Sequence, residues 1–131
     1  MAKTAAAPAC PCSPERRYAD CCGRYHAGQI APTPEALMRS RYSAYVLGLD
    51  DYLLASWHAS SRPAALDLQD EPPRKWLDLT INRQYTNPDD TGVVEYCARF
   101  KIGGRAYRLH ETSRFVREQG RWYYRDGDIH D

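Results

Sequence analysis

Four of the five cysteines lie close together near the N-terminus, and their spacing is the clearest chemical signal in the chain. They follow the pattern C-x-C-x8-C-C, two close pairs separated by eight residues. Four thiolates can surround a Zn²⁺ ion tetrahedrally, and a shell filled by four sulfurs leaves no open position for a substrate, as is typical of structural zinc. We therefore expect one structural Zn²⁺ per chain. The expected ligands are Cys10, Cys12, Cys21 and Cys22, with His26 as the alternative to Cys22.

The segment that holds these cysteines is predicted to need the metal in order to fold. Residues 10–25 are polar and contain no apolar stripe that could bury a core. In small zinc modules the bound metal contributes on the order of 10 kcal/mol to folding. A redox role is less favoured, because the thioredoxin-type spacing C-x-x-C is absent from the sequence. The isolated Cys97 is expected to be an unreactive thiol.

A second candidate site lies in the stretch 105–117, which is expected to be a strand. Its alternation places Glu111 and Ser113 on the same face as apolar residues. A buried carboxylate must be paired or protonated, so we expect partners from the first helix: an arginine, Arg39 or Arg41, or tyrosine hydroxyls. A structural network is favoured over a general base, and no residue is expected to be catalytic. The expected pocket residues are Glu111, Ser113, Tyr42, Tyr45 and Arg41.

The remaining histidines are expected to have milder roles. His110 points to the opposite face of the strand from Glu111 and is expected at the surface. His58 is expected to cap the carbonyl groups at the end of the second helix, and a contribution to a cavity is the alternative. His130 is expected to lie in a loose C-terminal tail.

The elements that position these residues are helices followed by strands. Thr33 is an N-cap candidate, Pro34 suits the first helical position, and Gly48 terminates a helix over 33–47. A second helix is expected from Asp50 or Asp51 through Trp57. A short helix around 64–68 is left open.

After residue 75 the hydrophobic period changes to two, which predicts an antiparallel meander. Turn residues 87–92 and the pair Gly103-Gly104 separate three of its strands. This order predicts an α+β fold in which the helices cover one face of a curled sheet. The expected strands are 77–82, 93–102, 105–117 and 121–125.

Charge and composition exclude several classes. The 131 residues include 18 Lys+Arg and 17 Asp+Glu, and this balance argues against a dedicated DNA-binding domain. No apolar run approaches the roughly 18 residues that a transmembrane helix needs, so no membrane partner is expected. Residues 1–9 contain no hydrophobic signal region, and we expect a cytoplasmic protein. RNA binding is an alternative, through the aromatic residues Trp76, Trp122, Tyr123 and Tyr124 and the arginines Arg114, Arg117, Arg121 and Arg125.

Two stretches resemble known families. Cys10-Pro11-Cys12, the basic pair Arg16-Arg17 with Tyr18, and Cys21-Cys22-Gly23 resemble the SEC-C zinc motif, found at the carboxyl end of the SecA translocation ATPase. The text LMRSRYSAYVLGLDDYLLASWH, with the later SRF and GRWYYRDG, resembles the bacterial YchJ family. Together the resemblance covers almost the whole chain. The usual Gly-Ser-Gly after the second cysteine is replaced by Ser13-Pro14-Glu15, while all four ligands are retained.

The resemblance implies an NTF2-like, or cystatin-like, cone preceded by a SEC-C knuckle. The expected division is a disordered stretch 1–9, the knuckle 10–30 and the cone 31–131. Because the SecA motif is associated with contacts to the SecB chaperone and the ribosome, the resemblance implies a docking surface for a protein or ribosomal partner. We therefore expect a zinc-binding, non-catalytic adaptor. The alternative is a small-molecule-binding protein or enzyme that uses the cone cavity, with Glu111 as its polar anchor or base.

Overall fold

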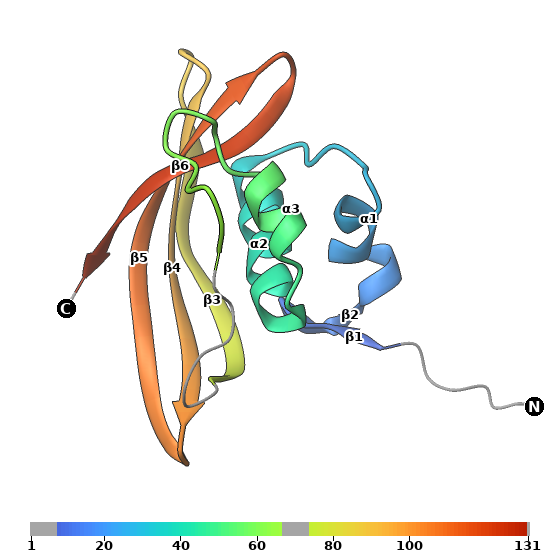
Figure 1. Ribbon diagram of the computed structural model, residues 1–131, viewed down its shortest axis with the longest axis vertical. Coiled ribbons are helices and arrows are strands. Elements are labelled where there is room, and N and C mark those ends of the chain that lie inside the picture. The colour runs from blue at the N-terminus through green and yellow to red at the C-terminus, as the bar shows by residue number, and fades with distance from the viewer. Residues whose placement is uncertain (1–7, 67–73, 131) are drawn as a thin grey trace, which may run out of the picture.

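The computed structural model describes residues 8–66 and 74–130. Its elements are β1 (Ala9–Cys10), β2 (Ser13–Arg17), the 3-10 helix η1 (Tyr18–Asp20), α1 (Cys22–His26), α2 (Pro34–Leu47), α3 (Asp50–Ala55), β3 (Lys75–Thr86), β4 (Thr91–Ile102), β5 (Arg105–Glu118) and β6 (Arg121–His130). Strands β3 to β6 form an antiparallel meander in sequence order. Helices α2 and α3 lie on one side of this sheet, and β1, β2, η1 and α1 lie beyond them (Figure 1). We call residues 9–26 the N-terminal module.

Helix α2 is the central element and forms where the sequence predicts it. The Thr33 side chain accepts a hydrogen bond from the backbone N–H of Ala36, and Pro34 occupies the first turn. The helix ends at Gly48, whose φ of 74° lies in the left-handed region that favours glycine. Residues 37–38 and 40–44 are buried, although they include serines and an arginine. Burial on every side follows from the position of α2 between the sheet and the N-terminal module.

The other local predictions need corrections. Helix α3 ends at Ala55, and the following Trp57 instead forms a β-bridge with Tyr124 of β6. Residues 64–66 are not helical, and the rest of the helix left open at 64–68 lies outside the described residues. Strand β6 continues to His130, so this residue is part of the sheet and not of a loose tail.

The face of the sheet toward α2 carries the core. The alternation predicted for β4 is confirmed, since Val94, Tyr96, Ala98 and Phe100 are all buried. In β3 a break in register between Trp76 and Asp78 leaves Leu77 as an extra residue, 37% exposed. The period-two alternation over 77–82 would put Leu77 on the same face as Leu79 and Ile81, which pack against the core. The β-bulge explains the difference, because one extra residue turns its side chain away from the ladder.

The N-terminal module shares this core. The four clustered cysteines and Tyr25 belong to the same buried cluster as Leu37, Met38 and Tyr42 of α2. The hydrogen bond from the Tyr18 N–H to the Pro8 carbonyl ties down the end of the stretch expected to be disordered; residues 1–7 lie outside the described residues. The module is therefore packed on the cone and is not a separately tethered unit.

Candidate metal centre and cavity

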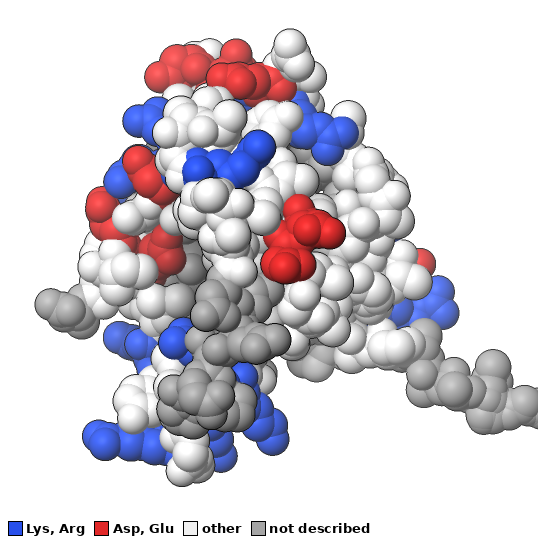
Figure 2. All heavy atoms as spheres, viewed as in Figure 1, with Lys and Arg blue, Asp and Glu red and all other residues white. Residues whose placement is uncertain are grey.

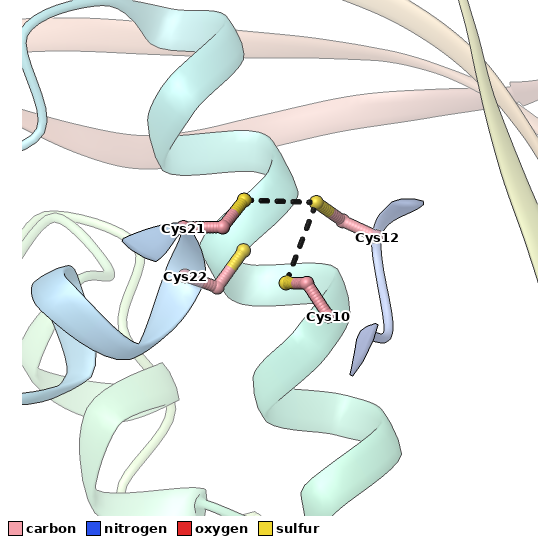
Figure 3. A group of neighbouring side chains, drawn as sticks. All are labelled: Cys10, Cys12, Cys21 and Cys22. Atoms are coloured by element: carbon pink, nitrogen blue, oxygen red, sulfur yellow. Dashed lines mark hydrogen bonds between the residues drawn. The ribbon is translucent and has the colours of Figure 1, made fainter. Parts of the chain in front are cut away.

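The four clustered cysteines converge on one point between the N-terminal module and α2 (Figure 3). Cys10 and Cys12 flank the β1–β2 turn, while Cys21 and Cys22 precede and begin α1. All four side chains are buried, and their sulfur atoms lie within 4.8 Å of one another. The distances from Cys12 Sγ to Cys10 Sγ and to Cys21 Sγ are both 3.6 Å.

These positions fit a tetrahedral zinc ion. With Zn–S bonds of about 2.3 Å, the sulfurs of a tetrahedral site lie ~3.8 Å apart. The observed spacing is close to this value, and the soft thiolate set matches what Zn²⁺ prefers. Because all four corners come from protein, such a site holds the chain together and leaves no position for a substrate.

The buried thiols influence one another's protonation, in opposite directions. Hydrogen bonding from the Cys22 thiol is the largest cause that lowers the pKa of Cys12 to about 5. The reciprocal interaction with Cys12, together with burial, raises the pKa of Cys22. A metal ion would remove this competition by taking the place of the shared protons.

His26 lies outside the group of sulfurs. Its Nε2 donates to the backbone carbonyl of Ser40 at 2.8 Å, so its Nδ1 accepts from the Tyr18 hydroxyl at 2.5 Å. Burial lowers the pKa of His26, which agrees with a neutral ring. With both nitrogens engaged, His26 supports the module and Cys22 is the better fourth ligand.

The residues of α2 that face the N-terminal module either have small side chains or form hydrogen bonds with the module. The Ser43 hydroxyl lies 3.6 Å from Cys10 Sγ, and Arg39 Nη1 donates to the Cys12 carbonyl at 3.4 Å. The Ser40 hydroxyl bonds the Leu37 carbonyl and the Tyr52 hydroxyl. Small side chains at positions 40 and 43 allow the cysteine cluster to approach the helix closely.

A cavity of about 290 Å³ lies on the opposite side of α2, between this helix and the sheet. All five residues expected in a pocket line it: Arg41, Tyr42, Tyr45, Glu111 and Ser113. Further walls come from Trp57, Trp76, Tyr96 and Tyr124. The cavity is thus largely aromatic, and its volume lies near the lower end of small-molecule sites.

Glu111 is the buried carboxylate of this cavity, but its partners differ from those expected. It accepts hydrogen bonds from the hydroxyls of Tyr96 at 2.7 Å, Ser113 at 3.2 Å and Tyr124 at 3.2 Å. The expected partners on α2, an arginine or the hydroxyls of Tyr42 and Tyr45, do not bond it within the described residues. The sheet itself supplies the donors, because Tyr96 of β4 stands directly opposite Glu111 of β5.

Gly127 is a residue that the sequence reasoning missed. A Cβ atom at this position of β6 would lie 2.1 Å from Glu111 Oε2 and 3.0 Å from the Thr112 carbonyl oxygen. The bare Cα of Gly127 therefore makes room for the carboxylate. The motif GRWYYRDG contains this glycine, but only the pairing of β5 with β6 connects it to Glu111.

The other singled-out residues lie away from both sites. His110 faces the outer side of the sheet and bonds Glu95 at 2.7 Å. His58 does not cap its helix, because its ring bonds Ser60 and Glu118. Cys97 is half-buried on the outer side of β4, opposite His110.

The arginines considered for RNA are partly engaged. Arg114 forms ion pairs with Asp126 and Asp128, and Arg117 pairs with Asp90. Basic side chains instead gather at the lower end of the molecule in Figure 2, where the β4–β5 hairpin ends. The exposed basic residues of this hairpin are Arg99, Lys101, Arg105 and Arg108.

No helix in the described part of the chain is long and apolar enough to cross a bilayer.

Comparison with known proteins identifies the family that shares this architecture. Residues 33–127 match the family model described as YchJ, middle NTF2-like domain. A UPF0225 protein of Chromobacterium violaceum is 55% identical over 130 residues, which cover 95% of this chain and 96% of the relative. A UPF0225 protein of Bordetella pertussis is 52% identical over 133 residues, covering 98% and 99% of the two chains.

Solved structures extend the similarity to the N-terminal module. A SEC-C motif containing protein from Rhodopseudomonas palustris is 34% identical, with a TM-score of 0.79, over 95% of this chain and 100% of that one. A SEC-C motif containing protein from Psychrobacter arcticus is 28% identical, with a TM-score of 0.76, over 94% and 83%. The chain is a member of the YchJ family, with an NTF2-like cone and a SEC-C cysteine cluster at its N-terminal end.

Proposed function

We propose that this protein binds a small organic ligand in its NTF2-like cavity, and that one structural Zn²⁺ per chain holds the N-terminal module on the helix that forms one cavity wall. The observation that carries the proposal is the carboxylate of Glu111, buried among aromatic walls with three hydroxyl donors. Burying a charge is costly, and functional cavities are where such groups are found.

The cavity is favoured over the metal centre as the place of action. The four thiols are buried and converge on one point, so a metal held by all four would offer no coordination position to a small molecule. The cavity between α2 and the sheet, in contrast, contains unfilled space that a small molecule could occupy. The metal is assigned a structural role because four thiolates fill a tetrahedral shell.

Native mass spectrometry of the untagged protein, purified without chelator, tests both parts. We expect a mass excess of one zinc ion per chain that disappears on denaturation. A further small-molecule mass, lost together with the fold, would support the cavity function directly. Protein that is folded and free of zinc would overturn the structural-metal assignment.

Docking of the N-terminal module to a ribosomal partner is a second candidate. Strand β2 is exposed from Pro14 to Arg17, and the solved neighbours carry the same SEC-C motif. Co-sedimentation with purified ribosomes tests it. Under this function Arg16→Glu abolishes co-sedimentation, while Lys101→Glu at the basic hairpin leaves it unchanged. The reverse result would assign the contact to the hairpin.

A further inference from the structure

Arg41 is a buried cation for which the described residues supply no anion. Its side chain is 3% exposed, and Nη1 donates to the Leu53 carbonyl at 2.8 Å and to the Ser56 hydroxyl at 2.6 Å. Both acceptors are neutral. No described residue accepts a hydrogen bond from Nε or Nη2, the two atoms whose parallel N–H groups match a carboxylate.

The surroundings of this guanidinium make the absence of an anion costly. It lies 4.6 Å from the centre of the Tyr124 ring and 5.1 Å from that of Trp57. Burial lowers the pKa of Arg41, so the protein alone disfavours its charge. An anionic group entering the cavity would offset this desolvation.

Glu111 of β5 is the opposite case, on the side of the cavity that the sheet forms. Its side chain is 8% exposed, and its three partners are hydroxyl groups, none of them a cation. Among the described residues no Lys, Arg or His forms an ion pair with it. An ionised carboxylate can accept about four hydrogen bonds, so one acceptor position remains for a ligand.

Tyr124 connects the two charges. Its ring lies under the Arg41 guanidinium, and its hydroxyl bonds Glu111. Both residues line the same cavity, yet they are not paired with each other within the described structure. The cavity therefore presents a positive and a negative group that are separated along one aromatic side chain.

We propose that the ligand of this cavity is a zwitterion: a carboxylate that binds the free edge of Arg41, an ammonium group that binds Glu111, and an apolar or aromatic body between them. This inference rests on the proposed ligand-binding function and specifies its ligand class. The aromatic walls suit such a body, and the ammonium can also lie against the ring faces.

Four probes of one skeleton test the ligand class by isothermal titration calorimetry with the zinc-loaded full chain. They are 4-(aminomethyl)benzoate (zwitterion), 4-methylbenzoate (anion), 4-methylbenzylamine (cation) and 4-methylbenzyl alcohol (neutral). We expect the zwitterion to bind at least about tenfold more tightly than each of the others, because it makes both charge-assisted contacts.

Glu111→Gln and Glu95→Gln form a matched pair of variants. The substitution is the same, but Glu95 lies on the outer face of the sheet with His110. We expect Glu111→Gln to reduce the advantage of the zwitterion over 4-methylbenzoate to about onefold, and Glu95→Gln to preserve it. Arg41→Lys, which keeps the charge but removes the planar fork, should weaken both carboxylate probes and leave the amine unaffected.

The outcomes separate the two proposals. Binding of only the neutral or a singly charged probe would overturn the zwitterion and leave the cavity function standing. Absence of binding by all four probes at millimolar concentration would overturn both. An equal effect of Glu111→Gln and Glu95→Gln would overturn the role assigned to Glu111.

Discussion

The two sides of helix α2 are both buried, but they are built in different ways. The side toward the cysteine cluster carries small residues, Ser40 and Ser43, and its polar groups have partners within the protein. The side toward the sheet carries Arg41 and aromatic residues, and it borders open space. A surface whose polar groups are all satisfied stabilises a fold, while a surface with unmatched buried charge is prepared for a ligand. Under the proposed function, this difference corresponds to a structural role for one side of α2 and ligand binding for the other.

The largest effect is expected from Cys22→Ser, which alters the cysteine cluster on the structural side of α2. Loss of one of four thiolates weakens the metal site, and the module shares its core with α2. The melting temperature should fall by roughly 10 °C or more, because metal binding in such sites is folding free energy. Thermal unfolding and zinc content measured on the same sample check this result.

Cys97→Ser is the matched control for that variant. This substitution also replaces a thiol by a hydroxyl group. Cys97 lies outside the cluster, half-buried on the outer side of β4. It should retain zinc and its melting temperature. Similar losses in both variants would show that the cluster has no special role in stability.

Gly127→Ala is expected to have the next largest effect. This substitution alters the cavity between α2 and the sheet. The added Cβ would lie 2.1 Å from Glu111 Oε2, so the carboxylate must leave its three hydroxyl partners. We expect a loss of ~2–3 kcal/mol in the free energy of unfolding, together with loss of probe binding and unchanged zinc content. Urea denaturation and zinc analysis provide the readouts.

A double-mutant cycle shows whether this loss acts through the carboxylate. In a Glu111→Ala background the Oε2 atom is gone, and Gly127→Ala should cost at least about 1 kcal/mol less than in the wild type. An equal cost in both backgrounds would mean that the clash with the Thr112 carbonyl, at 3.0 Å, determines the effect.

Local chemistry made the cysteine cluster and α2 predictable from sequence. The spacing of the cysteines limits where their sulfurs can lie, and the N-cap Thr33 with the terminator Gly48 fixes both ends of the helix within a few residues. The position of the module could not be predicted in this way. The contact of Ser43 with Cys10 joins residues 33 positions apart, and no pattern of period two or 3.6 encodes it.

The partners of Glu111 were partly within reach of sequence reasoning. The two-residue turn Gly103-Gly104 pairs Ile102 with Arg105, and counting back along both strands pairs Tyr96 with Glu111. Tyr124 was out of reach, because it stands opposite Phe115 and not opposite Glu111, and only its long side chain brings the hydroxyl to that carboxylate. Alternation gives the face of a strand, whereas its partners depend on register and bulges.

Ser43→Val is a smaller change on the structural side. Ser43 is fully buried, and its hydroxyl lies 3.6 Å from Cys10 Sγ, so a larger side chain pushes the module away from α2. Overpacking of this kind costs about 2 kcal/mol, and zinc should be lost faster to a chelator. Probe affinity should stay unchanged, because Ser43 faces away from the cavity. Ser43→Ala, which adds no volume, serves as the control, and faster zinc loss in it as well would contradict the packing explanation.

The smallest effect is expected at an exposed ion pair on the outer face of the sheet, which belongs to neither side of α2. Arg99 Nε of β4 bonds both carboxylate oxygens of Asp78 at 3.0 Å, and the two side chains are 57% and 41% exposed. Solvent screens an exposed pair, so Arg99→Gln should lower the free energy of unfolding only slightly at pH 7.

The pH dependence of this difference identifies its source. The hydrogen bonds from Arg99 are the largest cause that lowers the pKa of Asp78. The contribution of the pair is therefore complete above the unfolded pKa, about 3.9, and is lost as the pH falls through the lower folded pKa. Urea denaturation of the wild type and Arg99→Gln at matched pH separates this loss from the acid release of zinc, which affects both proteins alike. A difference that persists once Asp78 is protonated would mean that Arg99 acts through packing, as buried residues on the two sides of α2 do, and not through its charge.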